Sequence, residues 1–270
     1  MFYKFFITGI KMSATQEFTF PLNVWDNIVK NLDNDSWINL MYTCKFFYYD
    51  YGMIFVKKLE IFEFIRKPEE DPIIITPWMD SLLLTANDKI VQKLFVRENL
   101  YIQTQYPLTN ILPKIIKCNL IVLKIDFYNL TWNEYSLLTE CGRIKHLLLN
   151  GSKIEYSNND RVLLEDIMSQ IPNAEYISIK PCNCTTETFS KLKLVERNAK
   201  IRQLQLIEMD TILKAPEVFD YCKDVFNFEY FCFLTIQFRK EMMNDNEFCI
   251  FITEMIDLAK GNWQCIFLKK

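Results

Sequence analysis

The apolar residues of 91–270 recur in one frame of three apolar positions. Two residues separate the first apolar position from the second, and one residue separates the second from the third. Successive copies of the frame begin 24 to 30 residues apart. The last two apolar positions are separated by one residue, as on a strand with one buried face, so each copy predicts a short strand. The six copies are Val91/Leu94/Val96, Leu120/Leu123/Ile125, Ile144/Leu147/Leu149, Ala174/Ile177/Ile179, Ile201/Leu204/Leu206 and Phe228/Phe231/Phe233.

Helix signals lie between these frames. Thr131 and Glu134 have the spacing of a capping box, which satisfies the free N–H groups at a helix start. Amphipathic segments at 160–171, 211–223 and 245–260 predict three further helices, and Trp263/Ile266/Leu268 predicts a last strand. The chain from 91 onward therefore alternates strands with helices.

This alternation predicts an α/β fold with parallel strands. The frame resembles that of leucine-rich repeats, and the first copy continues to Asn99, at the place of the asparagine in that consensus. The other copies lack the asparagine. We expect a short irregular leucine-rich-repeat solenoid, with an ordinary doubly wound α/β domain as the alternative.

Residues 18–52 show a different pattern. Apolar residues recur there at helical spacing in two stripes, one before and one after the acidic break at 33–35. Pro21 suits the first turn of a helix, and Asp33 to Asp35 offers an N-cap to the next. Periodicity alone favours a helical hairpin that caps the core behind it.

The order of residues in this segment resembles the F-box, a three-helix module. The F-box pattern runs from a Leu-Pro pair through apolar pairs and an acidic break to a Cys-x-x-Phe ending. Its counterparts here are Phe20-Pro21-Leu22, Val24-Trp25, Ile28-Val29, Leu32, Asp33 to Asp35, Trp37-Ile38, Leu40 and Cys44 to Phe47. Phe20 and Trp37 depart from the usual leucines, although both remain apolar. An F-box followed by divergent leucine-rich repeats also resembles the nematode-type F-box families.

The resemblance implies a partner and a role. The F-box binds a Skp-type adaptor, which links it to a cullin ligase core, so the chain would be the substrate-recognition subunit of an SCF-type ubiquitin ligase. The docking residues implied are Pro21, Leu22, Trp25, Ile28, Ile38 and Leu40. A repeat scaffold that never meets a ligase is the alternative.

The expected organisation is an extension at 1–17, the F-box at 18–52, a connecting helix and linker at 53–90, and the repeat domain at 91–270. Residues 53–65 are apolar and predict a helix, while 66–72 are polar with two prolines and predict a loop. Within 73–84 the pattern permits a strand at 73–75 and a short helix at 78–84.

Side chains between the buried positions of each frame are expected to line an exposed face, because side chains alternate along a strand. Tyrosines, amides and one histidine there suit the recognition of a target protein. The expected target-binding residues are Lys93, His146, Tyr176, Gln203 and Tyr230.

Composition narrows the function further. The net charge is −3 and basic residues are scattered, so no nucleic-acid footprint is expected. An odd number of cysteines, nine, indicates reduced thiols and a cytoplasmic or nuclear protein. A single histidine, few glycines and no nucleophile motif argue against an enzyme, a metal site or a cofactor. No segment predicts a membrane span.

Overall fold

The computed structural model describes residues 53–63, 78–85, 90, 93–226, 232–244, 246–259 and 265–266. All of them belong to the unit Tyr51–Lys270. The N-terminal extension, the F-box with its six docking residues, and the linker at 66–72 lie outside the described residues, so the expectations for them stay predictions.

The described chain forms an α/β fold built on a parallel sheet of ten strands. Along the sheet the order is β12-β11-β10-β9-β7-β5-β3-β1-β2, with β4 also paired to β3, and every pairing is parallel. The strands are β1 (Met53–Phe62), β2 (Trp78–Thr85), β3 (Lys93–Gln103), β4 (Ile115–Cys118), β5 (Val122–Asp126), β7 (His146–Asn150), β9 (Tyr176–Lys180), β10 (Gln203–Met209), β11 (Phe233–Phe238) and β12 (Cys265–Ile266).

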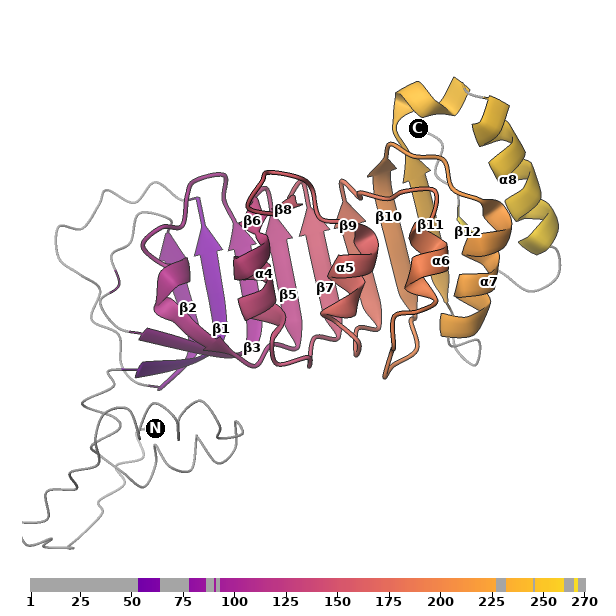
Figure 1. Ribbon diagram of the computed structural model, residues 1–270. Coiled ribbons are helices and arrows are strands. Elements are labelled where there is room, and N and C mark those ends of the chain that lie inside the picture. The colour runs from indigo at the N-terminus through magenta and orange to yellow at the C-terminus, as the bar shows by residue number, and fades with distance from the viewer. Residues whose placement is uncertain are drawn as a thin grey trace, which may run out of the picture. The chain divides into compact units, whose positions relative to one another are not determined.

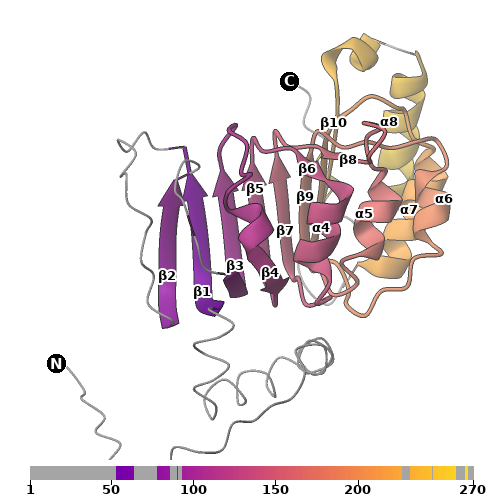
Figure 2. The ribbon, with the colours of Figure 1, turned by 60° about the vertical axis from the view of Figure 1, so that its left-hand side comes forward.

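The helices α4 to α7 cover one face of this sheet, and α8 lies next to α7 at its end (Figures 1 and 2). They are α4 (Trp132–Thr139), α5 (Leu164–Ser169), α6 (Thr188–Leu192), α7 (Ala215–Val225) and α8 (Asn246–Ala259). Two 3-10 helices, Leu112–Lys114 and Lys240–Asn244, and the small sheet of β6 (Leu130–Thr131) and β8 (Ile154–Glu155) complete the connections. The alternation of strands and helices predicted from the sequence is confirmed.

The core lies between the sheet and the helices. The alternate strand residues that point to the helices are almost fully buried, and removing such a side chain from water contributes about 1.5–3 kcal/mol. They include Leu123, Ile125, Leu147, Leu149, Ile177, Ile179, Leu204, Leu206, Leu234 and Ile236. The apolar frame in the sequence thus corresponds to one buried face of the sheet.

The capping box predicted at the start of α4 is confirmed. The Thr131 backbone N–H donates to the Glu134 carboxylate at 2.8 Å, and the Glu134 N–H donates to the Thr131 hydroxyl at 3.2 Å. Behind it Tyr135 is fully buried and donates its hydroxyl to the Ile167 carbonyl at 3.1 Å. The box fixes where α4 leaves β6.

Loss of this cap should be measurable. Replacing Thr131 with alanine removes the acceptor for the Glu134 N–H, and we expect the free energy of unfolding to fall by about 1 kcal/mol. Thr131→Ser keeps the hydroxyl and should lose much less. Urea unfolding of both variants compares them, and equal losses would contradict the capping role.

The helix predicted at 53–65 is wrong. Residues 53–62 form β1, which lies between β2 and β3 with Val56, Leu59 and Ile61 fully buried. The short helix that the pattern permits at 78–84 is not formed, because Trp78–Thr85 is the edge strand β2. An apolar run of this length has the same composition in a buried strand and a buried helix, so periodicity could not separate them.

The last predicted frame is out of register. Leu204 pairs with Leu234 and Leu206 with Ile236, so the buried positions of β11 lie three residues after the predicted Phe231 and Phe233. The helices α5 and α7 also begin later than predicted, at Leu164 and Ala215, and the five-residue α6 was not predicted. Phenylalanines at neighbouring positions permit more than one frame, and only the pairing with β10 selects one.

Candidate binding face

The face of the sheet opposite the helices carries two columns of side chains. All of them except Thr235 are at least partly exposed. No described helix covers this face (Figure 2), and we call it the helix-free face. Its first column is Ser81, Lys58, Asn99, Val122, His146, Tyr176, Gln203 and Phe233. Its second column is Leu83, Glu60, Tyr101, Lys124, Leu148, Ser178, Gln205 and Thr235.

Three of the five predicted target-binding residues lie side by side in the first column. His146 pairs with Tyr176 across β7 and β9, and Tyr176 pairs with Gln203 across β9 and β10. All three side chains are partly exposed. The short strands of this region each carry one frame, and that frame predicts their common register correctly.

Lys93 does not belong to this column. It is exposed, but it lies at the start of β3, whereas the residue of β3 that pairs with Val122 is Asn99. With eleven residues, β3 carries the last two apolar positions of the frame twice, at Leu94 and Val96 and again at Leu100 and Ile102. The prediction used the first copy, and β5 pairs with the second. Asn99 is therefore a residue of the helix-free face.

Tyr230 lies outside the described residues. The position predicted for it in the first column is occupied by Phe233, which pairs with Gln203. Phe233 is partly exposed, so the aromatic character of the position is retained. The correction follows directly from the shifted frame of β11.

An aromatic pair occupies the centre of the first column. The rings of His146 and Tyr176 are stacked, with centroids 4.5 Å apart and planes at 5°. Burial lowers the pKa of His146, an effect that nearby Glu175 opposes and Lys145 reinforces. The lowered pKa favours the neutral imidazole, which presents a flat, uncharged surface together with the phenol.

A shallow hollow of about 220 Å³ lies on the same face, over β1, β3 and β5. The ammonium group of Lys58 lies 2.7 Å from the Glu60 carboxylate and 5.0 Å from the centre of the Tyr101 ring. The lining residues are Lys58, Glu60, Phe62, Tyr101, Ile102, Gln103, Lys124 and Asp126. Sequence reasoning missed this hollow, although the second frame of β3, ending in Leu100 and Ile102, contained the signal for Tyr101.

The chemistry of the helix-free face suits surface recognition. Within the described residues there is no cluster of three histidine, cysteine, aspartate or glutamate side chains able to hold a metal ion. The ionic groups that flank the hollow are already paired, Lys58 with Glu60 and Lys124 with Asp126 at 3.1 Å. What remains available to a partner is a set of aromatic rings, amides and hydroxyls.

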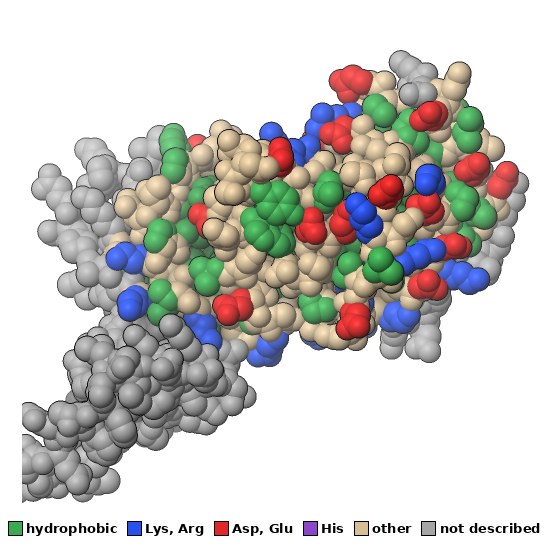
Figure 3. Space-filling view, viewed as in Figure 1, with side chains coloured by type: hydrophobic (Ala, Val, Ile, Leu, Met, Phe, Trp, Pro, Cys, Tyr) green, Lys and Arg blue, Asp and Glu red, His purple; other side chains and the backbone are tan. Residues whose placement is uncertain are grey.

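The helix-bearing side differs from this face. Figure 3 shows acidic, basic and apolar side chains interspersed over it, without a broad patch of one charge. The structure describes seven cysteine side chains, and none of these seven is in a disulfide: Cys118, Cys141, Cys182, Cys184, Cys222, Cys232 and Cys249. In the described part of the chain, no helix combines the length and apolarity that crossing a membrane requires.

No protein-family model, curated protein or solved structure matches the chain. The fold and the site by themselves define an α/β protein with a parallel sheet, helices on one face of it and an aromatic-centred second face.

Proposed function

We propose that this chain is the substrate-recognition subunit of an SCF-type ubiquitin ligase, and that it has no catalytic residues of its own. Residues 18–52 would bind a Skp-type adaptor and, through it, a cullin ligase core. The helix-free face would bind the target protein. The observation that carries the target-binding part is the stacked pair of His146 and Tyr176 at the centre of a partly exposed column.

We further propose that the units from β5 to α8 are degenerate leucine-rich repeats. Support comes from strands that are adjacent in the order of the chain, pair in parallel, and place the intervening helices on one face. The proposal does not extend to β1 and β2. There the strand order reverses, since β1 lies between β3 and β2.

The target we propose is a protein surface with aromatic or aliphatic side chains and unpaired amide or carbonyl groups. Aromatic residues at the centre of an interface supply much of the binding energy because they bury a large area at a small entropic cost. Gln203, Ser178 and Gln205 provide hydrogen bonds around the aromatic pair. The ion pairs of the hollow lie toward one end, where they would add selectivity.

The face can be tested with a double variant. Replacing His146 and Tyr176 with alanine should weaken target binding by about 2 kcal/mol or more, which is about thirtyfold. The free energy of unfolding should fall by only about 1 kcal/mol, because both side chains are partly exposed and lose mainly their mutual stacking. Quantitative mass spectrometry of cross-linked partners and urea unfolding measure the two effects.

Lys93→Ala is the matched control, since Lys93 is exposed but lies outside both columns. It should leave partner recovery unchanged. If the double variant retains its partners, or if it loses stability as a core variant does, the helix-free face is not the target site.

The alternative is a scaffold of repeats that never joins a ligase. The two functions can be separated because the helix-free face lies entirely after residue 52, so that removing 18–52 leaves that face in the chain. Affinity capture with the full chain and with a chain lacking 18–52 separates the two functions. Recovery of the adaptor and cullin by the full chain alone supports the ligase subunit. Equal sets of partners without an adaptor support the scaffold.

A further inference from the structure

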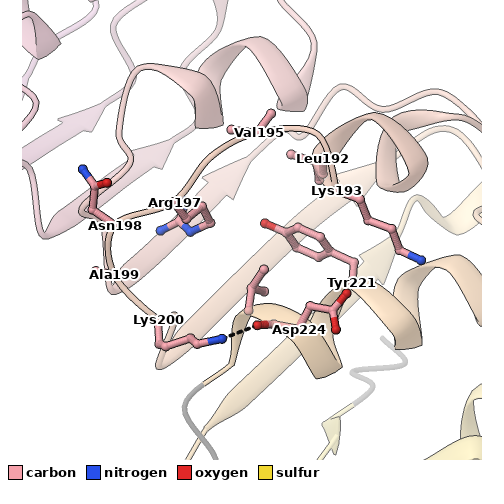
Figure 4. A pocket seen from close by; sticks show the side chains of 10 residues that line it. Leu192, Lys193, Val195, Arg197, Asn198, Ala199, Lys200, Tyr221 and Asp224 are labelled. Atoms are coloured by element: carbon pink, nitrogen blue, oxygen red, sulfur yellow. Dashed lines mark hydrogen bonds between the residues drawn. The ribbon is translucent and has the colours of Figure 1, made fainter.

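A second pocket lies away from the helix-free face, between the segment 193–200 and the last turns of α7 (Figure 4). Its volume is about 250 Å³, too small for most drug-sized ligands and large enough for a small anion or one side chain. The residues that line it are Leu192, Lys193, Val195, Arg197, Asn198, Ala199, Lys200, Tyr221, Asp224 and Val225.

Arg197 brings an unpaired charge to this pocket. Its Nη2 donates to the Ala174 carbonyl, while Nε and Nη1 are buried and have no hydrogen-bond partner in the described structure. Arg161, Arg202 and Arg239 each lie within 4 Å of a carboxylate, at 3.7, 3.0 and 3.8 Å, but Arg197 forms no such ion pair with a described residue. Burial lowers the pKa of the Arg197 guanidinium, yet an arginine stays charged in proteins.

Tyr221 brings a second unpaired group. Its side chain is 1% exposed, and its hydroxyl has no hydrogen-bond partner among the described residues. The ring packs edge-on against Phe189, with centroids 5.5 Å apart, and this contact directs the hydroxyl toward Arg197 (Figure 4). Burial raises the pKa of Tyr221, so the hydroxyl remains a protonated donor.

Unpaired donors of this kind are costly. A buried polar group without a partner costs about 1–3 kcal/mol, and more when it is charged. Three of them, Nε and Nη1 of Arg197 and the hydroxyl of Tyr221, belong to two residues that line one pocket. An acceptor with negative charge would satisfy the hydroxyl and the guanidinium together, whereas water would leave the positive charge without a counter-charge.

The surroundings of the pocket are also cationic. Lys193, Arg197 and Lys200 line it, against the carboxylate of Asp224, and Lys193 is paired with Asp220 at 3.3 Å, so the excess positive charge comes from Arg197 and Lys200. The last carbonyls of α7 would repel an anion, but they already accept hydrogen bonds. Lys200 Nζ donates to the Asp224 carbonyl, and the Ile201 N–H donates to the Val225 carbonyl at 2.8 Å.

We propose that this pocket binds a phosphate group, free or carried by a phosphorylated side chain, on Arg197 and Tyr221. Arg197 supplies the charge, Tyr221 a neutral donor, and Lys200 further positive potential at the rim. A tetrahedral anion accepts from several directions at once, as donors on different elements require. This binding is independent of the adaptor and of the helix-free face.

The buried position of the Arg197 nitrogens adds a mechanical consequence. Neither nitrogen exposes surface, and nor does the Tyr221 hydroxyl, so a phosphate oxygen reaches these three donors only when the segment 195–200 moves outward. Binding must therefore change the backbone signals of this segment as well as the Nε–H signal of Arg197. Phosphate held only by the surface lysines would change neither.

The experiment is a titration of the full chain, followed by ¹H–¹⁵N spectra and by calorimetry. The probes are inorganic phosphate and O-phosphoserine, with sodium chloride at matched ionic strength as the reference. We expect saturable binding that shifts the Arg197 Nε–H signal. Arg197→Met should weaken it about tenfold or more, and Tyr221→Phe about two- to tenfold, as befits a charged and a neutral hydrogen bond.

Arg143→Met makes the same change at an exposed arginine and should bind as the unmodified chain does. Tyr221→Phe keeps the packing on Phe189, so the test remains decisive if Arg197→Met does not fold. Tighter binding of O-phosphoserine would identify a phosphorylated side chain as the source, and equal binding a free anion. No saturation by either probe, or full binding by Arg197→Met or by Tyr221→Phe, would overturn the proposal.

Discussion

Replacing Leu147 with alanine is expected to lower the free energy of unfolding by about 2–5 kcal/mol. Leu147 is fully buried at the centre of the sheet, where it pairs with Leu123 of β5 and Ile177 of β9. The substitution removes its buried methyl groups and leaves a cavity that neighbouring strands cannot close, because their positions are fixed by the ladder on both sides. Urea unfolding, followed by circular dichroism, measures the loss.

Leu148→Ala is the matched control. The two leucines are adjacent, but Leu148 points to the helix-free face, between Lys124 and Ser178, and is partly exposed. Its replacement should cost about 1 kcal/mol or less. The opposite order of the two losses would mean that the strands present the other face to the core, and the candidate binding face would then be misassigned.

Replacing Leu22 and Trp25 together with alanine is expected to abolish recovery of a Skp-type adaptor. Both residues belong to the apolar stripe of 18–52, in which the F-box resemblance places them at the docking surface. Large apolar side chains at the centre of an interface are the ones whose truncation costs the most binding energy, about 2 kcal/mol or more each. Two of them should bring the affinity below detection in a pull-down with purified adaptor.

The control variant carries alanine at Asn23 and Asp26, which lie in the same segment but outside the apolar stripe. It should bind the adaptor as the unmodified chain does. Unfolding curves of the described domain should be equal for both variants. Undiminished adaptor recovery by the variant of Leu22 and Trp25 would remove the ligase function and leave the scaffold.

The part of the fold that could be predicted is the part in which local pattern and long-range pairing agree. From β5 to β10 each strand is short and carries one apolar frame, so the buried positions of one strand align with those of the next. This is why the apolar frame alone suffices to place His146, Tyr176 and Gln203 side by side. The capping box at Thr131 could also be predicted from the sequence, because all its hydrogen-bonding groups lie within four residues.

The errors arose where the chain offered more than one pairing. In β3 two frames are available, and β5 selects the second, which moves Lys93 out of the column and Asn99 into it. In β11 several phenylalanines fit the frame, and Leu204 selects Leu234. The pocket at Arg197 could not be foreseen at all, because Arg197 and Tyr221 come from different elements and neither has a distinctive sequence context.

The sequence by itself therefore determined the alternation of strands and helices, the buried face of most strands and the modestly acidic net charge of the chain. These depend on which side chains avoid water and on caps made by near neighbours. Only the tertiary structure decided that 53–62 is a strand, that β1 lies between β2 and β3, and which frame of a long strand meets its neighbour. A ladder hydrogen bond joins backbone groups, which are the same in every residue, so register is selected by how whole faces pack together. That selection also brought Arg197 and Tyr221 to one pocket.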